Sequence, residues 1–118
     1  MKKSKKLKLS TYNCNLIIII TDNLKGEVNA VYKRLKQKDV FSDEAEGILL
    51  SLDIDNYYLI FDTQYLSHNT IAHEIYHAVV KVTEDRDLVE EESQAWLAGY
   101  LTEEVYKYID KHEFKIIK

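Results

Sequence analysis

The sequence predicts an α+β domain in which a three-stranded sheet packs against about three helices. Three observations lead to this expectation. The apolar patterns follow one another in the order strand, helix, strand, strand, helix, helix, which is typical of helices packed on a small sheet. The length of 118 residues suits a single domain covering 1–118. With 46% apolar and 11% aromatic residues, the chain has enough material for one compact core, which excludes intrinsic disorder.

The chain begins with a basic stretch. Five of its 16 basic residues are lysines among the first eight positions, so the rest of the chain has 11 basic against 20 acidic residues, a charge of −9. We therefore expect residues 1–10 to be a flexible, solvated arm. The acidic body would repel a polyanion, which disfavours a nucleic-acid partner. A nucleic-acid-associated role through the lysine arm is the weakest of the functional alternatives.

The next two elements are predicted to be a strand and a helix. Residues 12–21 are rich in β-branched side chains and continuous in their apolar part, which indicates a buried central strand. Asp22 or Asn23 is expected to cap a helix, because the apolar positions that follow (24, 28, 31, 32 and 35) have helical spacing. Residues 37–46 are polar and acidic, and are expected to form a loop.

The second half of the chain is predicted to form a hairpin and two helices. Residues 47–52 and 57–61 are short strand-like runs, and the Asp53-Ile54-Asp55-Asn56 segment between them is a turn signal. A second helix is expected over 67–82, and a charged break at 83–87 separates it from a third helix over 88–109. The tail, 112–118, is expected to be a short strand or a loose end.

Composition also limits where the protein acts. The longest apolar run, residues 16–20, is far shorter than the roughly 18–20 residues that a membrane span needs. No signal-peptide pattern follows the basic start. The single cysteine, Cys14, excludes an internal disulfide and a cysteine-rich zinc module. We therefore expect a cytoplasmic protein with no membrane partner, in which Cys14 is reduced and buried.

The most informative motif is His73-Glu74-Ile75-Tyr76-His77, an H-E-x-x-H pattern on the second predicted helix. Residues i and i+4 lie one above the other on a helix, so both imidazoles can reach one metal ion. Glu74 is rotated by about 100° from His73, which lets it polarise a metal-bound water. The alternative is two surface histidines on an amphipathic helix. The apolar stripe expected to face the sheet consists of Ile71, Ile75, Ala78, Val79 and Val82, and both histidines fall on the opposite side.

A catalytic zinc ion takes three protein ligands and one water, so a third ligand is expected from the next helix. Glu92 shares a helix face with the small Ala95 and with Trp96, which we expect to be a large buried anchor. Glu92 is therefore the predicted third ligand, Glu91 is the alternative, and Glu90 is expected to be exposed. Acidic residues at a helix start also have an ordinary explanation, since they interact favourably with the helix dipole.

These motifs together resemble a known group of enzymes. His73-Glu74-x-x-His77 followed by Glu92-x-x-Ala95-Trp96 resembles the gluzincin zinc metallopeptidases, and residues 70–74 look like the minimal ImmA/IrrE-type peptidases and related phage and bacterial proteins. The resemblance covers roughly residues 58–108. It implies a minimal zincin-like fold, bound Zn²⁺, and a bacterial or phage-infected host cytosol. Trp96 stands four residues after Glu92, where many gluzincins carry an aspartate.

The expected function is zinc-dependent hydrolysis of a protein or peptide substrate. Zn²⁺ lowers the pKa of a bound water, and Glu74 is expected to act as the general base and then to protonate the leaving amine. Tyr76, Tyr100 or His68 could stabilise the oxyanion, although each also has a plain packing or helix-start explanation. The strand 57–61, if it lies at the sheet edge, could bind an extended peptide.

A second function is compatible with the same residues. The chain could be a non-catalytic phage or mobile-element protein that keeps zinc as a structural clamp and binds a host protein. Its small size leaves little room for a deep substrate cleft. The substitution Glu74→Gln distinguishes the two, because a binding protein should tolerate it.

Overall fold

The computed structural model describes residues 2–34, 47–51 and 55–117. Its strands are β1 (Lys2–Leu9), β2 (Cys14–Thr21), β3 (Gly47–Leu50) and β4 (Asn56–Asp62). Its helices are α1 (Leu24–Arg34), α2 (His68–Asp85) and α3 (Glu91–Lys111), with short 3-10 turns at Ser10–Tyr12 and Thr63–Tyr65. The α+β class and the three helices are confirmed. The predicted loop 37–46 and the first two residues of the predicted turn, Asp53 and Ile54, lie outside the described residues.

The four strands form one mixed sheet in the order β1-β2-β4-β3. β1 pairs antiparallel with β2, β2 pairs parallel with β4, and β4 pairs antiparallel with β3. The central position expected for the strand within 12–21 is confirmed, since β2 has a neighbour on each side. The antiparallel pairing expected for the two strands of the hairpin is confirmed too, with Gly47 opposite Phe61 and Leu50 opposite Tyr58.

The prediction of three strands and a flexible basic arm is wrong, because residues 2–9 form β1. Leu7 and Leu9 are buried in the main core, and Leu7 pairs with Leu16 of β2. The lysines of β1 are exposed, as is common on an edge strand, where charged side chains discourage pairing with another chain. The pairing of all eight residues with β2, together with the two buried leucines, therefore holds the stretch in the sheet.

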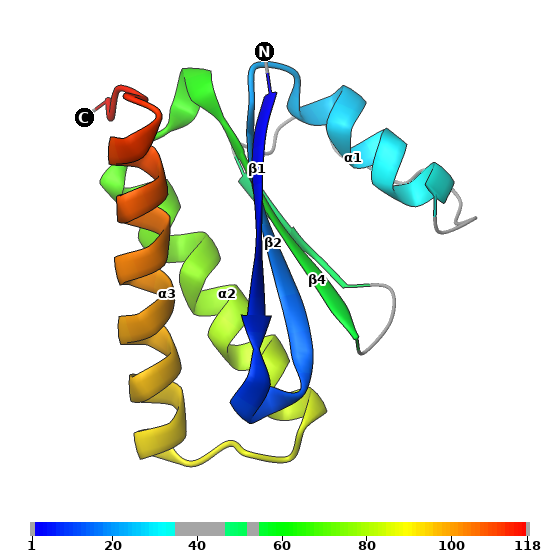
Figure 1. The fold of residues 1–118 in the computed structure, drawn as a ribbon, viewed down its shortest axis with the longest axis vertical. Helices are drawn as coiled ribbons and strands as arrows, with labels where there is room; N and C mark the ends of the chain where they lie inside the picture. The colour runs from blue at the N-terminus through cyan, green and yellow to red at the C-terminus, as the bar shows by residue number, and fades with distance from the viewer. Residues whose placement is uncertain (1, 35–46, 52–54, 118) are drawn as a thin grey trace.

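The two faces of the sheet are covered differently (Figure 1). On one face, Leu16, Ile18 and Ile20 of β2 join side chains of β4, α2 and α3 in the larger core cluster. On the other face, Ile19 and Ile60 pack with α1 in a smaller cluster. The H-E-x-x-H motif therefore lies on a helix that packs against the more extensively covered face.

Local signals set the starts of α1 and α2. The Oδ1 of Asn23 accepts a hydrogen bond from the Gly26 N–H at 3.1 Å, which confirms the predicted cap of α1. The Ser67 side chain accepts from the Thr70 N–H at 3.1 Å and caps α2. The predicted sheet-facing stripe of α2 is confirmed, since all five of its side chains are buried: Ile71, Ile75, Ala78, Val79 and Val82. In the part of the chain that is described, no helix combines the length and the apolar character that a membrane crossing needs.

A polar cluster holds the C-terminal end of α2 against the sheet. The fully buried Tyr57 donates from its hydroxyl to Oδ2 of Asp85 at 2.7 Å and accepts from Arg86 at 3.1 Å. The Nε of Arg86 donates to the carbonyl of Tyr12, beside the buried, free Cys14. At the other end of α2, Ser67 pairs with Ile117 in an isolated parallel bridge, so the tail makes one strand-like contact.

Candidate metal centre

The two histidines of the motif converge on one point. His73 and His77 are exposed on α2, and their Nε2 atoms lie 3.1 Å apart. Two imidazoles bound to the same tetrahedral zinc ion, each at about 2.0–2.1 Å, have their nitrogens about 3.3 Å apart. The two nitrogens are within hydrogen-bond distance of each other, and their separation is close to that of two ligands of a single zinc ion, as the i, i+4 spacing predicts.

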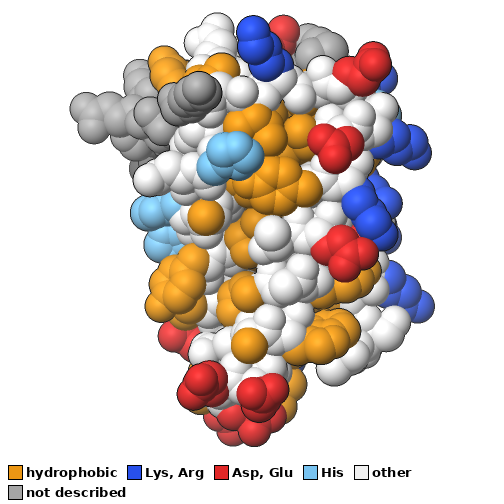
Figure 2. Space-filling model, turned by 90° about the vertical axis from the view of Figure 1, so that its left-hand side faces the viewer, with side chains coloured by type: hydrophobic (Ala, Val, Ile, Leu, Met, Phe, Trp, Pro, Cys, Tyr) orange, Lys and Arg blue, Asp and Glu red, His pale blue; other side chains and the backbone are white. Residues whose placement is uncertain are grey.

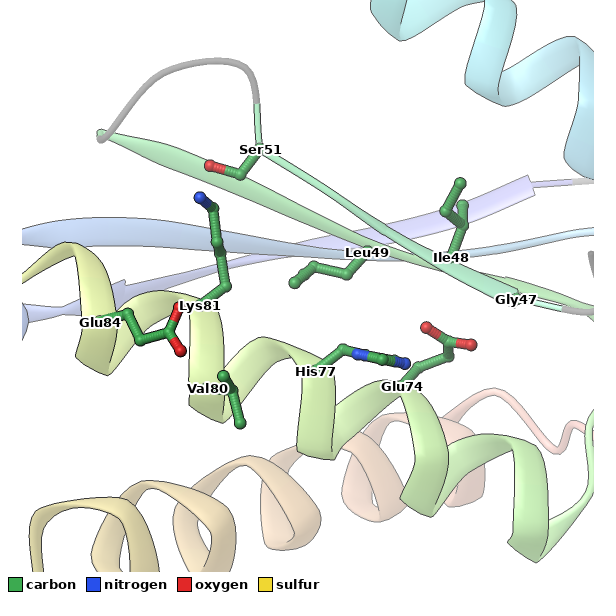
Figure 3. Close-up of a pocket in the computed structure, with 9 residues that line it drawn as sticks. All are labelled: Gly47, Ile48, Leu49, Ser51, Glu74, His77, Val80, Lys81 and Glu84. Atoms are coloured by element: carbon green, nitrogen blue, oxygen red, sulfur yellow. The ribbon is translucent and has the colours of Figure 1, made fainter. Parts of the chain in front are cut away.

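Glu74 lies beside this pair and is buried. Its side chain lies between α2 and β3 (Figure 3). Oε2 of Glu74 is 4.0 Å from Nε2 of His73. Burial raises the pKa of Glu74 above its ordinary value, while the nearby His73 and His77 act in the opposite direction. The carboxyl group thus accepts a proton more readily than an exposed one would.

A groove of about 500 Å³ runs from Glu74 along α2, with β3 as its opposite wall (Figure 3). The sequence analysis does not predict this groove. Helical periodicity does predict which residues of α2 share a face with Glu74. What the sequence does not reveal is that β3 is the strand next to it. The groove is lined by Gly47, Ile48, Leu49, Ser51, Glu74, His77, Val80, Lys81 and Glu84.

The predicted third ligand is not brought to the histidine pair. Glu92 is exposed in the first turn of α3, and the Gln94 side chain nearby donates to Oγ1 of Thr83 at 3.2 Å. This hydrogen bond places the first turn of α3 beside Thr83. Thr83 is six residues, or about 9 Å of helix, beyond His77. Among residues 2–34, 47–51 and 55–117, no group of three or more His, Cys, Asp or Glu side chains is placed to hold a metal ion. The expectation that Glu92 points inward is wrong, and its role as a ligand stays a prediction.

The alternative, Glu91, is exposed as well, as is Glu90. Glu91 lies at the rim of a second, largely apolar groove between α2 and α3, lined also by Tyr76, Val80 and Ala95. Figure 2 shows apolar side chains gathered on this face of the molecule, with acidic side chains at its lower end. The three consecutive glutamates therefore fit their dipole explanation better than a metal-binding one in this conformation.

The prediction that Trp96 is a buried anchor is wrong. Its side chain is 55% exposed and stacks on Tyr100, with ring centroids 5.5 Å apart. Leu97 is fully buried instead, and it begins a stripe with Leu101, Val105 and Ile109. The four-residue spacing of these aliphatic positions was the signal that fixes the rotation of α3, and it outweighs the size of Trp96.

The remaining predicted site residues have mixed outcomes. His68 is the first residue of α2, as expected, and its Nδ1 is 2.7 Å from the hydroxyl of Tyr106. Tyr76 is 67% exposed, so it is not a packing tyrosine. The strand 57–61 is not at the sheet edge, because β4 lies between β2 and β3. β3 is the end strand of the described sheet and lies beside Glu74.

No protein-family model, curated protein or solved structure matches this chain.

Proposed function

We propose that the protein is a zinc-dependent metallopeptidase in which His73 and His77 bind the metal and Glu74 is the catalytic acid and base. The observation that carries the proposal is the convergence of the two Nε2 atoms at 3.1 Å with a buried carboxyl group beside them. Zinc bound there would act as a Lewis acid and would make a bound water more acidic. Glu92 stays the predicted third ligand, with Glu91 as the alternative.

Glu74 performs the proton transfers of the proposed reaction. Its carboxylate accepts a proton from the attacking water and donates it to the amine nitrogen as the peptide bond breaks. Its burial supports this role, since the raised pKa brings the group closer to the pH at which a carboxyl can both accept and release a proton.

The proposed substrate is an extended segment of a protein or peptide. β3 pairs with β4 on one side only and is the end strand of the described sheet, so backbone groups along its other side can pair with an added strand. A segment bound there would run along the groove between β3 and α2, over the apolar side chains of Leu49 and Val80. The expected cellular location is the cytosol, where Cys14 would stay reduced.

The test combines metal analysis with peptide hydrolysis. Glu74→Gln should keep zinc and lose at least about 100-fold in rate, because it removes the proton acceptor without touching a ligand. His77→Ala should lose both zinc and activity. Glu103→Gln is the matched control, since Glu103 is an exposed glutamate of α3 and is not among the residues that line the groove. Absence of stoichiometric zinc after zinc addition, or full hydrolysis by the Glu74→Gln variant, would refute the proposal.

A second candidate function is a non-catalytic protein that uses zinc as a clamp and binds a host protein. The exposed Trp96 and Tyr100 stack favours it, because exposed aromatic side chains are common at protein interfaces. In that case Glu74→Gln should leave function intact, while Trp96→Ala should weaken capture of the partner.

A further inference from the structure

Gly47, the first residue of β3, has no backbone reason to be glycine. None of the glycines in the described part of the chain has a positive φ, so an L-amino acid side chain would meet no backbone strain there. Glycine also weakens a strand relative to most residues. The atoms that surround position 47 are therefore the remaining explanation for a glycine there.

The space that a side chain would need is already occupied. A Cβ atom at position 47 would lie 3.2 Å from Cγ of Glu74, 3.3 Å from the carbonyl oxygen of Ile60 and 3.3 Å from Cγ2 of Thr70. Ordinary contacts between carbon atoms are about 3.5–4.0 Å, so at least one neighbour would have to move.

The neighbour that can move is Glu74. The Ile60 carbonyl belongs to the backbone of an internal strand, and Thr70 is buried in the first turn of α2. The side chain of Glu74 has several rotatable bonds and lies at the groove between β3 and α2. A methyl group at position 47 would therefore shift the Glu74 side chain by a few tenths of an ångström, and with it the carboxylate that lies 4.0 Å from Nε2 of His73.

We propose that Gly47 is a positioning residue for Glu74: its missing side chain leaves the space in which the carboxylate lies beside the two histidines. The effect of Gly47 on hydrolysis rests on the proposed function. Its contact with Glu74 does not, so the two can be tested separately.

The contact is tested first in metal-free protein by chemical denaturation. Gly47→Ala should lower the folding equilibrium constant about tenfold in the wild-type background, the lower end of the range for overpacking. The loss should be clearly smaller in a Glu74→Ala background, which lacks the Cγ atom that the new methyl group would meet. Gly99→Ala is the matched control, because a Cβ there meets nothing within 4 Å, and it should not destabilise the protein. Equal losses in the two backgrounds would overturn the proposal.

A direct measurement covers the case in which the double variant does not fold. In the Gly47→Ala variant alone, nuclear Overhauser effects should link the introduced methyl group to the γ protons of Glu74, and the Thr70 methyl resonance should shift. Absence of the first contact in a folded variant would also overturn the proposal.

Kinetics then test the catalytic consequence. Gly47→Ala should keep zinc affinity within about twofold, because His73 and His77 are untouched. kcat should fall about tenfold, since a misplacement of about 1 Å can cost about 100-fold and the shift expected here is a fraction of that distance. Gly47→Val should lose more, and Gly99→Ala should lose nothing. Coupling to Glu74 in a protein that hydrolyses no peptide would refute the enzyme function and leave the positioning role. An active wild-type protein with an equally active Gly47→Ala variant would refute the positioning role.

Discussion

Zinc should raise the thermal stability of this protein, and substitution of either histidine should abolish the increase. His73 and His77 are exposed, and their Nε2 atoms already converge at 3.1 Å, so binding needs little rearrangement of α2. A ligand that binds only the folded state stabilises it according to the ratio of its free concentration to its Kd. The assay is thermal unfolding followed by circular dichroism, with and without added zinc.

The size of the shift follows from that relation. At a free zinc concentration 100 times the Kd, the stabilisation is about 2.7 kcal/mol, or about 10 °C in Tm for a domain of this length. If His77→Ala weakens binding 100-fold, about 0.4 kcal/mol is left at the same concentration, which is less than about 2 °C. Without zinc the variant should unfold within about 0.5 kcal/mol of the wild-type protein, since His77 is exposed.

His68→Ala is the control for this experiment, because it removes an exposed histidine of the same helix that pairs with Tyr106 rather than with the motif. It should keep the full zinc shift. Glu92→Ala should reduce the shift if Glu92 is the third ligand, and Glu91→Ala should do so if the alternative is correct. A wild-type protein with no zinc shift, or a His77→Ala variant that keeps it, would refute the metal centre.

Three further predictions concern stability. Leu97→Ala should lower the free energy of unfolding by about 2–5 kcal/mol, because Leu97 is fully buried, and Trp96→Ala should lower it by only about 1 kcal/mol, because Trp96 is mostly exposed. Equal losses in urea denaturation would contradict the rotation of α3. Tyr57→Phe should lower the free energy of unfolding by about 1.5–3 kcal/mol in the same measurement, since it removes the hydroxyl that joins Asp85 and Arg86. An unchanged urea midpoint would show that this cluster does not hold α2. Burial raises the pKa of Glu74 in the folded state. In metal-free protein, protonated Glu74 therefore stabilises the fold at a pH below its unfolded-state pKa. This contribution is lost as the pH rises through its folded-state pKa. Unfolding midpoints between about pH 4 and pH 8 should show this loss in the wild-type protein but not in Glu74→Gln, and parallel pH curves would exclude it.

The parts of the fold that follow from local chemistry are predictable from the sequence. The cap at Asn23, one of the two residues proposed for it, is a side-chain hydrogen bond to the backbone three residues away. The convergence of His73 and His77 needs only the periodicity of one helix. These features depend on no distant part of the chain, so they could be read without knowledge of the fold.

Features that depend on distant partners could not be predicted in the same way. The lysines of β1 suggest a solvated arm, and only the pairing of Leu7 with Leu16 shows why the stretch is ordered. The size of Trp96 suggests that it is buried, whereas the aliphatic stripe that begins at Leu97 sets the rotation of α3. The close approach of Gly47 and Glu74 joins residues 27 positions apart, and neither residue type predicts it.

The mixed sheet also has a consequence for the order of folding. β1 with β2, and β3 with β4, are antiparallel neighbours joined by short connections, so each pair can form early. The parallel pairing of β2 with β4 joins residues such as Asn15 and Asn56, which are 41 positions apart, and closing so long a segment costs chain entropy before any contact forms. We therefore expect this step to limit the folding rate. The groove beside Glu74 is lined by β3 and α2, so its walls belong to the β3–β4 half of the molecule and can come together before this step. The larger core cluster, which joins β2 to β4 and α2, is completed only after it.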